Sequence, residues 1–153
     1  RERATRLVQE MEEVDQQVRA TLQLIPLEKR YLVTSHDAFH YFTRRYLAQD
    51  GELDWEKRFA APEGLSPEGQ LNPADLQKII HHLHTYKIEV LFPESNVSRD
   101  SIRKLVDAGK QIGLQLKVCK QALYGDSFQG RYLDAMKKNA EIISRSLHEE
   151  EAR

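Results

Sequence analysis

The stretch LVTSHDAF, residues 32–39, begins as an apolar run and then turns polar. The run is typical of a buried strand, and Ser35, His36 and Asp37 follow directly after it. In a parallel sheet, ligand sites gather at the edge where the carboxyl ends of the strands open. This stretch therefore predicts a core strand that brings an imidazole and a carboxylate to such an edge.

After Pro26, short apolar runs alternate with amphipathic stretches. We expect strands at residues 31–34, 58–61, 88–92 and 114–118. We expect helices at residues 38–47, 73–86, from 98 to 109 or 113, and 131–148, with a loop-rich insert over residues 50–72. Asn72 and Ser98 are expected helix caps. Strands that alternate with helices predict an α/β fold, with a mostly parallel sheet of three or four strands flanked by helices.

Residues 1–26 are expected to form one long helix, ended by Pro26. Apolar side chains recur every three or four residues and make a seam along one face: Ala4, Leu7, Met11, Val14, Val18, Thr21 and Ile25. A coiled coil needs at least about three heptads, and the seam just reaches that length. A self-pairing helix is one interpretation, and a long helix that lies across the domain is the favoured one.

Composition limits the kind of protein. The 153 residues, 40% hydrophobic and 31% charged, fit one compact domain with a real core. A formal net charge of -1 provides no basic field, so binding to nucleic acid is disfavoured. No apolar stretch approaches the roughly 20 residues that span a bilayer. The single cysteine, Cys119, excludes an internal disulfide and a cysteine-rich zinc site.

Three groups that can bind a metal follow three of the expected strands: His36, Glu94 and Asp126. If those strands are parallel, their carboxyl ends bring the three groups to one edge. One imidazole and two carboxylates form a mixed nitrogen and oxygen set, which suits Mn(II) or Fe(II) and permits zinc. The residues alone leave a plainer alternative open, in which His36 is a capping or hydrogen-bonding residue and the acids belong to loops or helix starts.

Other motifs carry less weight. Ser35, His36 and Asp37 contain the letters of a catalytic triad, but sequence neighbours cannot converge as nucleophile, base and orienting group. His81 and His84 share a face of an expected helix and could chelate a metal, although a solvated helix surface is the favoured interpretation. No glycine-rich phosphate loop follows an expected strand, which argues against nucleotide binding.

The chain resembles a known family in four segments that occur in the same order: RYLVTSHDAFHYFTRRY, EGLSPEGQLNPADLQKII, IEVLFPESNVSRDSIRKL and LYGDSFQGRYLDAMKKNAEIISRSL. The family is that of the TroA-like solute-binding proteins, which serve bacterial ABC importers of zinc, manganese and iron. The resemblance implies two lobes joined by a long helix, with the metal held between them. By this resemblance, residues 1–26 are the end of the linking helix and residues 27–153 are the carboxyl-terminal lobe. The amino-terminal lobe is then absent from the chain, which begins at Arg1 rather than Met.

The resemblance also implies a ligand set. His36 in TSHDAF, Glu94 at a strand end and Asp126 in the DS motif match metal ligands of the family, and a fourth ligand, a histidine, would come from the absent lobe. Zinc-selective members often have histidine where Glu94 stands, so the chain resembles the manganese or iron type. Gly125 either lets the backbone turn so that Asp126 points into the cleft or is a plain turn glycine.

The function implied by the resemblance is extracytoplasmic capture of a divalent metal, Mn or Fe in preference to Zn, and its delivery to the membrane permease of an ABC importer. The metal would be the transported ligand, and the protein would be periplasmic or lipid-anchored. No bond would be made or broken, so the protein is expected not to be an enzyme. Two alternatives stay open: a metal-dependent enzyme that uses the same histidine and carboxylates, and an interaction module built on the amino-terminal helix.

Overall fold

Four short parallel strands form the centre of the molecule. The computed structural model describes residues 2–63, 71–125 and 130–148. Its strands are β1 (Leu32–Val33), β2 (Phe59–Ala60), β3 (Val90–Leu91) and β4 (Lys117–Val118). β1 pairs with β2, β3 pairs with β4, and a parallel bridge between Thr34 and Phe92 joins the two pairs. The order is therefore β2-β1-β3-β4, which confirms the mostly parallel sheet predicted from the sequence.

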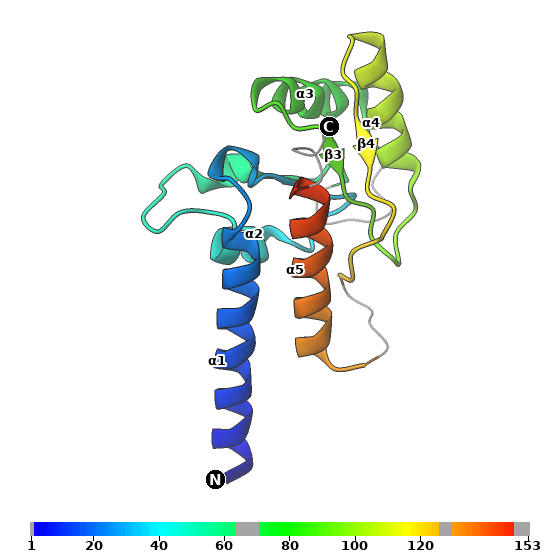
Figure 1. Ribbon diagram of the computed structural model, residues 1–153. Helices are drawn as coiled ribbons and strands as arrows, with labels where there is room; N and C mark the ends of the chain where they lie inside the picture. Colours follow the sequence, from blue (N-terminus) through cyan, green and yellow to red (C-terminus); the bar gives the residue numbers. More distant parts are fainter. Residues whose placement is uncertain (1, 64–70, 126–129, 149–153) are drawn as a thin grey trace.

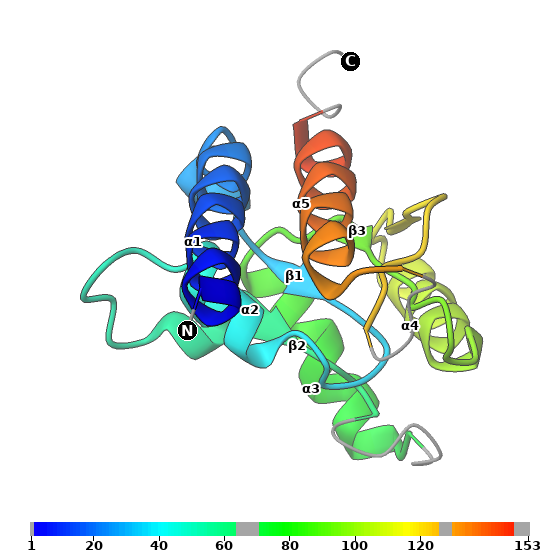
Figure 2. The ribbon, with the colours of Figure 1, turned by 90° about the horizontal axis from the view of Figure 1, so that it is seen from below.

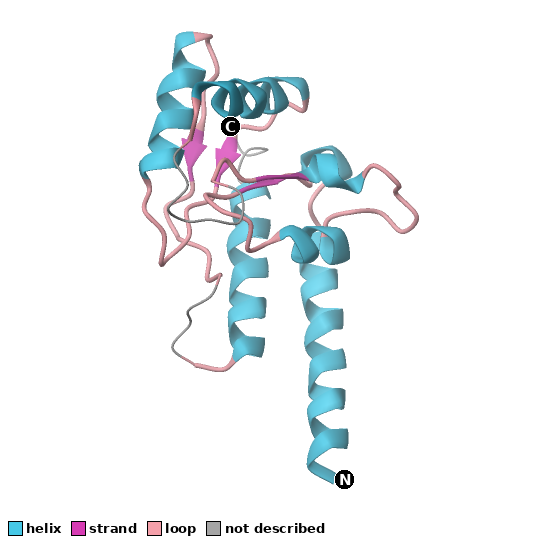
Figure 3. Ribbon diagram, turned by 180° about the vertical axis from the view of Figure 1, so that it is seen from behind, coloured by secondary structure: helices cyan, strands magenta, loops and turns pink. Residues whose placement is uncertain are grey.

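Helices cover both faces of this sheet (Figures 1 and 2). One face carries α1 (Glu2–Gln23), α2 (His40–Tyr46) and α5 (Tyr132–His148). The other face carries α3 (Pro73–Thr85) and α4 (Asp100–Gln111). Two short 3-10 helices, η1 (Leu27–Lys29) and η2 (Trp55–Arg58), precede β1 and β2. Figure 3 shows α1 and α5 side by side beneath the strands.

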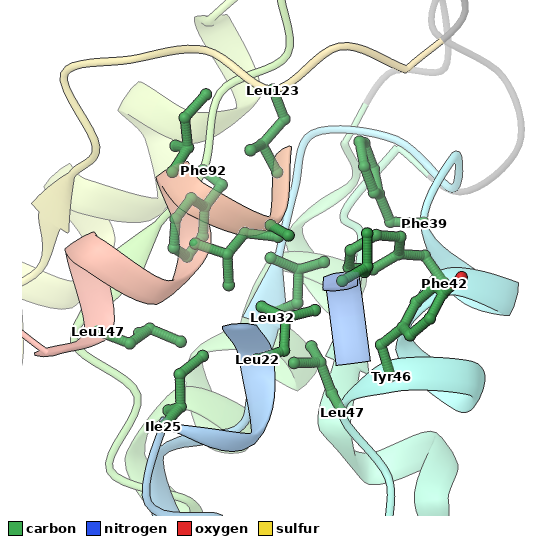
Figure 4. Packing of buried hydrophobic residues seen from close by; sticks show 14 of the residues in the cluster. Leu22, Ile25, Leu32, Phe39, Phe42, Tyr46, Leu47, Phe92, Leu123 and Leu147 are labelled. Atoms are coloured by element: carbon green, nitrogen blue, oxygen red, sulfur yellow. The ribbon is translucent and has the colours of Figure 1, made fainter. Parts of the chain in front are cut away.

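Successive strand residues point to opposite faces of the sheet and so build two cores. Leu32, Val90 and Phe92 belong to the core under α1, α2 and α5, whereas Val33 and Leu91 belong to the core under α3 and α4. Each large apolar side chain that is fully buried contributes about 1.5–3 kcal/mol. Figure 4 shows the first core, where side chains from three helices meet the strands: Leu22, Leu32, Phe42, Phe92 and Leu147.

Two helix ends occur where the sequence has a residue suited to ending a helix. The Asn72 side chain accepts a hydrogen bond from the backbone N–H of Asp75 at 2.9 Å, and Pro73 occupies the first helical position, as predicted. Gly113 has φ of +84°, in the left-handed region that favours glycine, and ends α4. Gly109, the other expected end, lies inside the helix.

Several elements are shorter than the sequence predicts. The helix expected from residue 98 begins at Asp100, and the Ser98 hydroxyl accepts the N–H of Asp100 at 3.2 Å from one position ahead of the N-cap. The strand expected at 114–118 pairs only at Lys117–Val118, and both of these residues are exposed at the sheet edge. A strand extends only as far as its neighbour offers hydrogen-bonding groups, and sequence does not show where that ends.

Only the carboxyl-terminal half of α1 packs against the domain. Val14, Val18 and Leu22 are buried against the first core, whereas Leu7 and Met11 are 51% and 49% exposed. The amino-terminal turns extend past the end of α5 (Figure 1). The apolar seam predicted from the sequence is therefore covered only in its second half. Across the part of the chain that the structure describes, no helix has the length and apolar character needed to cross a membrane.

A buried ion pair fixes the start of β2. Arg58 is 4% exposed, and its Nε donates to both carboxylate oxygens of Glu52 at 3.0 and 2.7 Å. One terminal nitrogen of Arg58 also donates to the carbonyl oxygens of Leu27 and Arg30 at 3.0 and 3.2 Å, which ties β2 to the turn before β1. Burial by itself would raise the pKa of Glu52, but hydrogen bonds from Arg58 and from the N–H of Gln49 lower it to about 2.

Replacing Arg58 with alanine should remove the two shortest charged contacts of the Glu52 carboxylate and leave beside it the N–H of Gln49 and the Nζ of Lys57, 3.4 Å from Oε1. We expect Arg58→Ala to lower the free energy of unfolding by about 3 kcal/mol, measured by urea denaturation. The matched control is Arg103→Ala on α4, because Arg103 pairs with Asp100 while its side chain is 72% exposed. That control should cost less than about 1 kcal/mol. Equal losses for the two variants would contradict the proposed importance of the buried pair.

Glu52 also makes stability depend on pH. Its pKa falls from an ordinary 4.5 to about 2 on folding, so below pH 4.5 the unfolded chain takes up a proton that the folded chain does not. The stabilisation is fully present above pH 4.5 and is lost as the pH falls towards 2. We expect Glu52→Gln to flatten the decline of the unfolding free energy in this window. Glu12→Gln, on the exposed side of α1, should leave the decline unchanged.

Candidate metal centre

The strand order makes a topological switch point at the carboxyl ends of β1 and β3, the place where such sheets are expected to form a crevice for a ligand. These two strands are joined through the bridge between Thr34 and Phe92, but β1 pairs with β2 on one side and β3 pairs with β4 on the other. Loops that diverge at such a switch point leave room for a ligand between them. The residues that directly follow β1 and β3 therefore border the crevice.

His36 and Glu94 meet at this crevice although they lie 58 residues apart in the sequence. The backbone N–H of His36 donates to Oε1 of Glu94 at 3.0 Å, and the imidazole Nδ1 forms an ion pair with Oε2 of Glu94. His36 is 4% exposed and Glu94 is 2% exposed. The structure thus brings together two of the three residues that were predicted to bind metal.

Burial sets the electrostatic character of Glu94. Loss of water raises the pKa of Glu94, and the N–H and imidazole of His36 oppose that rise only in part. A carboxylate charge held in a water-poor site is costly unless a cation lies beside it. A divalent metal would supply that charge, and an imidazole with a carboxylate is a donor set that transition metals accept. The residues present therefore fit a metal ion.

A third segment approaches the same point. Leu123 forms a parallel bridge with Glu94 and donates its N–H to the carbonyl of Pro93 at 2.8 Å. Two residues later, a Cβ on Gly125 would lie 3.5 Å from Oε2 of Glu94 and 3.9 Å from Cε1 of His36. The φ of Gly125 is not positive, and a Cβ there would lie 3.2 Å from the Cβ of Ala38, so the tight approach is to the loop after β1.

Asp126, the third predicted ligand, lies outside the described residues. Within residues 2–63, 71–125 and 130–148, no group of three or more His, Cys, Asp or Glu side chains could hold a metal ion. The pair of His36 and Glu94 is therefore the part of the predicted ligand set that the structure places, and Asp126 stays a prediction.

The residues on either side of His36 differ from expectation. α2 begins at His40, and its N-cap, Phe39, has no capping side-chain hydrogen bond. Ser35 does not cap this helix, because the chain bends over residues 35–39 before the helix starts. Asp37 also lies ahead of the helix, and the first turn of α2 contains no acidic residue.

The histidines of α3 lie away from the crevice. His81 and His84 are exposed, and the Nε2 atom of His81 lies 3.4 Å from the hydroxyl of Thr85. The favoured interpretation of these two side chains as a solvated helix surface agrees with this placement.

Two supporting side chains at the site were not predicted from the sequence. Thr34 is fully buried and its hydroxyl donates to the carbonyl of His36 at 2.8 Å. Asn139 of α5 exchanges two hydrogen bonds with the backbone of Tyr124. The only sign of Asn139 in the sequence is an amide side chain on the otherwise apolar face of the last helix.

Comparison with known proteins gives the family. The model of the ZnuA family, described as zinc-uptake complex component A, periplasmic, matches residues 1–146. The chain belongs to this family. The resemblance to metal-specific solute-binding proteins that the four sequence segments indicated is therefore confirmed.

The relatives agree in fold and extent. Metal-binding protein YtgA of Chlamydia trachomatis serovar D is 37% identical over 147 residues, which cover 94% of the chain and 45% of the relative. Manganese-binding lipoprotein MntA of Bacillus subtilis is 29% identical over 153 residues, covering 96% and 47%. The crystal structure of Fe(III)-bound YtgA from Chlamydia trachomatis matches with a TM-score of 0.87 at 36% identity, covering 94% and 50%. The chain thus spans about half the length of these relatives.

A buried carboxylate that serves to bind metal should lower the free energy of unfolding of the metal-free protein. Because the pKa of Glu94 is raised, the folded chain is favoured at low pH and loses stability as the pH rises through that pKa. We expect Glu94→Gln, which keeps the shape and removes the charge, to raise the unfolding free energy at pH 7 by about 1 kcal/mol. The measurement is urea unfolding with a chelator present.

The control for this change is Glu141→Gln on α5, where the carboxylate is 55% exposed. It should change the unfolding free energy by less than about 0.5 kcal/mol. A loss of stability in Glu94→Gln would show that the carboxylate is held for structure rather than for a ligand.

Proposed function

We propose that the protein carrying this chain captures a divalent transition metal outside the cytoplasm and delivers it to the membrane permease of an ABC importer. His36, Glu94 and Asp126 are the ligands that this chain contributes. The metal is the transported cargo, so the protein makes and breaks no bond in it. Residues 1–26 are the end of a helix that links two lobes, and residues 27–153 form the carboxyl-terminal lobe.

One observation carries the proposal: His36 and Glu94 are in contact, nearly fully buried, at the switch point between β1 and β3. A pair with only a structural purpose would do better as an apolar contact, because burying ionisable groups gives little net stability. A buried pair that binds a cation is stabilised by that binding, because the cation binds the folded protein. The family, described as a zinc-uptake component, supports transport as the purpose of that binding.

The donor set favours manganese or iron over zinc, with zinc as the alternative. One imidazole and two carboxylates offer a mixed nitrogen and oxygen environment without thiolate, and such sets suit Mn(II) and Fe(II). The printed names of the relatives are mixed: MntA is manganese-binding and the solved YtgA is bound to Fe(III), whereas TroA of Treponema pallidum is zinc-binding. Intrinsic affinity rises towards zinc for any such site, so metal supply decides part of the outcome in the cell.

The remaining coordination is proposed to come from the half of the protein outside this chain, through a histidine of an amino-terminal lobe. A metal held from both sides draws the lobes together, and the closed form is what the permease recognises. A periplasmic or lipid-anchored location follows from this role. It is supported by the family's description as periplasmic and by the lipoprotein name of MntA.

Two other functions were open from the sequence. A metal-dependent enzyme would keep a coordination position for water and would turn over a substrate, whereas the family is described as part of an uptake complex, which supports binding without catalysis. An interaction module built on α1 has one observation in its favour, the half-exposed Leu7 and Met11. Its self-association would be independent of His36.

The test is the metal affinity of the full-length protein that carries this chain. We expect His36→Ala to weaken Mn2+ binding by at least about a hundredfold, because removing a direct ligand costs more than removing a residue that supports one. The measurement is calorimetric titration of metal-stripped protein. Metal analysis of protein purified without added metal identifies the natural cargo.

His81→Ala on the exposed face of α3 is the matched control and should leave Mn2+ affinity unchanged within about twofold. Undiminished Mn2+ and Zn2+ binding in His36→Ala would exclude the proposed site. Light scattering on the same proteins tests the alternative of an interaction module, under which a dimer should persist in His36→Ala.

A further inference from the structure

Asn139 is a buried amide in the middle of a helix. It lies on α5 and is 2% exposed. Asparagine is a poor residue for a helix interior, and burying its amide is costly unless its donor and acceptor are both satisfied. Both are satisfied by one partner: Nδ2 donates to the carbonyl of Tyr124 at 2.9 Å, and the N–H of Tyr124 donates to Oδ1 at 2.9 Å. The side chain of Asn139 therefore holds the backbone of one residue, Tyr124, through two hydrogen bonds.

Tyr124 lies at the end of a short run of backbone hydrogen bonds beside Glu94. Leu123 donates to the carbonyl of Pro93 at 2.8 Å, and Ser95 donates to the carbonyl of Leu123 at 2.9 Å. Tyr124 follows directly after this pairing, and there the amide of Asn139 binds both its N–H and its C=O. Asn139 thus holds the segment at the place where it passes the carboxylate.

The next residue shows why this hold matters. A Cβ on Gly125 would lie 3.2 Å from the Cβ of Ala38 and 3.5 Å from Oε2 of Glu94. The space beside Gly125 is therefore tight towards the loop after β1, and the carboxylate of Glu94 borders the same space. A displacement of Tyr124 would shift Gly125 relative to Ala38 and Glu94. One surface pocket is lined by Ala38, Tyr124, Gly125 and Asn139.

We propose that Asn139 is a positioning residue for the metal site: its two bonds to Tyr124 fix Gly125 against Glu94 and His36. This inference rests on the proposed function. It extends that function from the residues that contact the metal to a residue on α5 that does not. The amide fits this task because it presents a donor and an acceptor in one rigid plane, which matches the donor and acceptor of a single backbone residue.

The test uses the full-length protein, three variants on α5 and a fourth at Gly125. Asn139→Ala removes both bonds, and Asn139→Gln keeps the amide but moves it by one methylene. Ser144→Ala is the matched control, because Ser144 lies on the same helix, is 7% exposed and donates to the carbonyl of Thr21 at 3.3 Å. Each protein is measured for unfolding without metal, for Mn2+ affinity and for the visible absorption spectrum of bound Co2+.

We expect both Asn139 variants to bind Mn2+ at least about tenfold more weakly and to shift the Co2+ spectrum, which reports the geometry of the ligands. Ser144→Ala should lose stability while keeping affinity within about twofold and the spectrum unchanged. Gly125→Ala displaces the same segment from the other side and should shift the Co2+ spectrum in the same way. This last variant carries the test if the Asn139 variants do not fold.

The outcomes separate the two proposals. A wild-type protein that binds neither Mn2+ nor Co2+ overturns the proposed function, and the inference falls with it. A wild-type protein that binds these ions, with Asn139 variants whose affinity and spectrum match Ser144→Ala, overturns the inference alone. An unshifted spectrum in Gly125→Ala also overturns it.

Discussion

The pairing between β1 and β3 is the contact on which the site depends. The N–H of Phe92 donates to the carbonyl of Val33 at 2.9 Å, and the bridge from Thr34 to Phe92 continues that pairing. Because both strands run in the same direction, the residues after them leave the sheet at one edge. His36 and Glu94 are in contact for this reason. The same pairing sends alternate side chains to two cores, so the fold and the site share one set of hydrogen bonds.

Two carboxylates with little exposure have opposite pKa shifts because their neighbours differ. Glu52 accepts two hydrogen bonds from the always-charged guanidinium of Arg58 and one from the N–H of Gln49, and its pKa falls to about 2. Glu94 contacts the imidazole of His36 and accepts one hydrogen bond from the backbone N–H of His36, and burial raises the pKa of Glu94. The first charge is compensated within the chain and stabilises the fold. The second is compensated only in part, which is the state expected of a group that awaits a cation.

α5 links the core to the site. Its apolar side chains, among them Ala140, Ile143 and Leu147, pack with the buried half of α1, and the two helices lie side by side on one face of the sheet (Figure 3). The same helix carries Asn139, which holds Tyr124. Packing that fixes the helix therefore also fixes the segment beside Glu94. This arrangement ties the loops that carry the site to rigid elements.

Local sequence determined the order of strands and helices, the Asn72 start of α3, a glycine end for α4 at one of two positions, and the position of His36 and Glu94 after strands. These follow from side-chain periodicity and capping, which act over a few residues. Tertiary structure alone decided how short the strands are, that Arg58, at the start of an expected strand, is buried against Glu52, and that Asn139 holds Tyr124. Each of these depends on a partner that lies far away in the sequence, and no local pattern encodes which distant groups will meet.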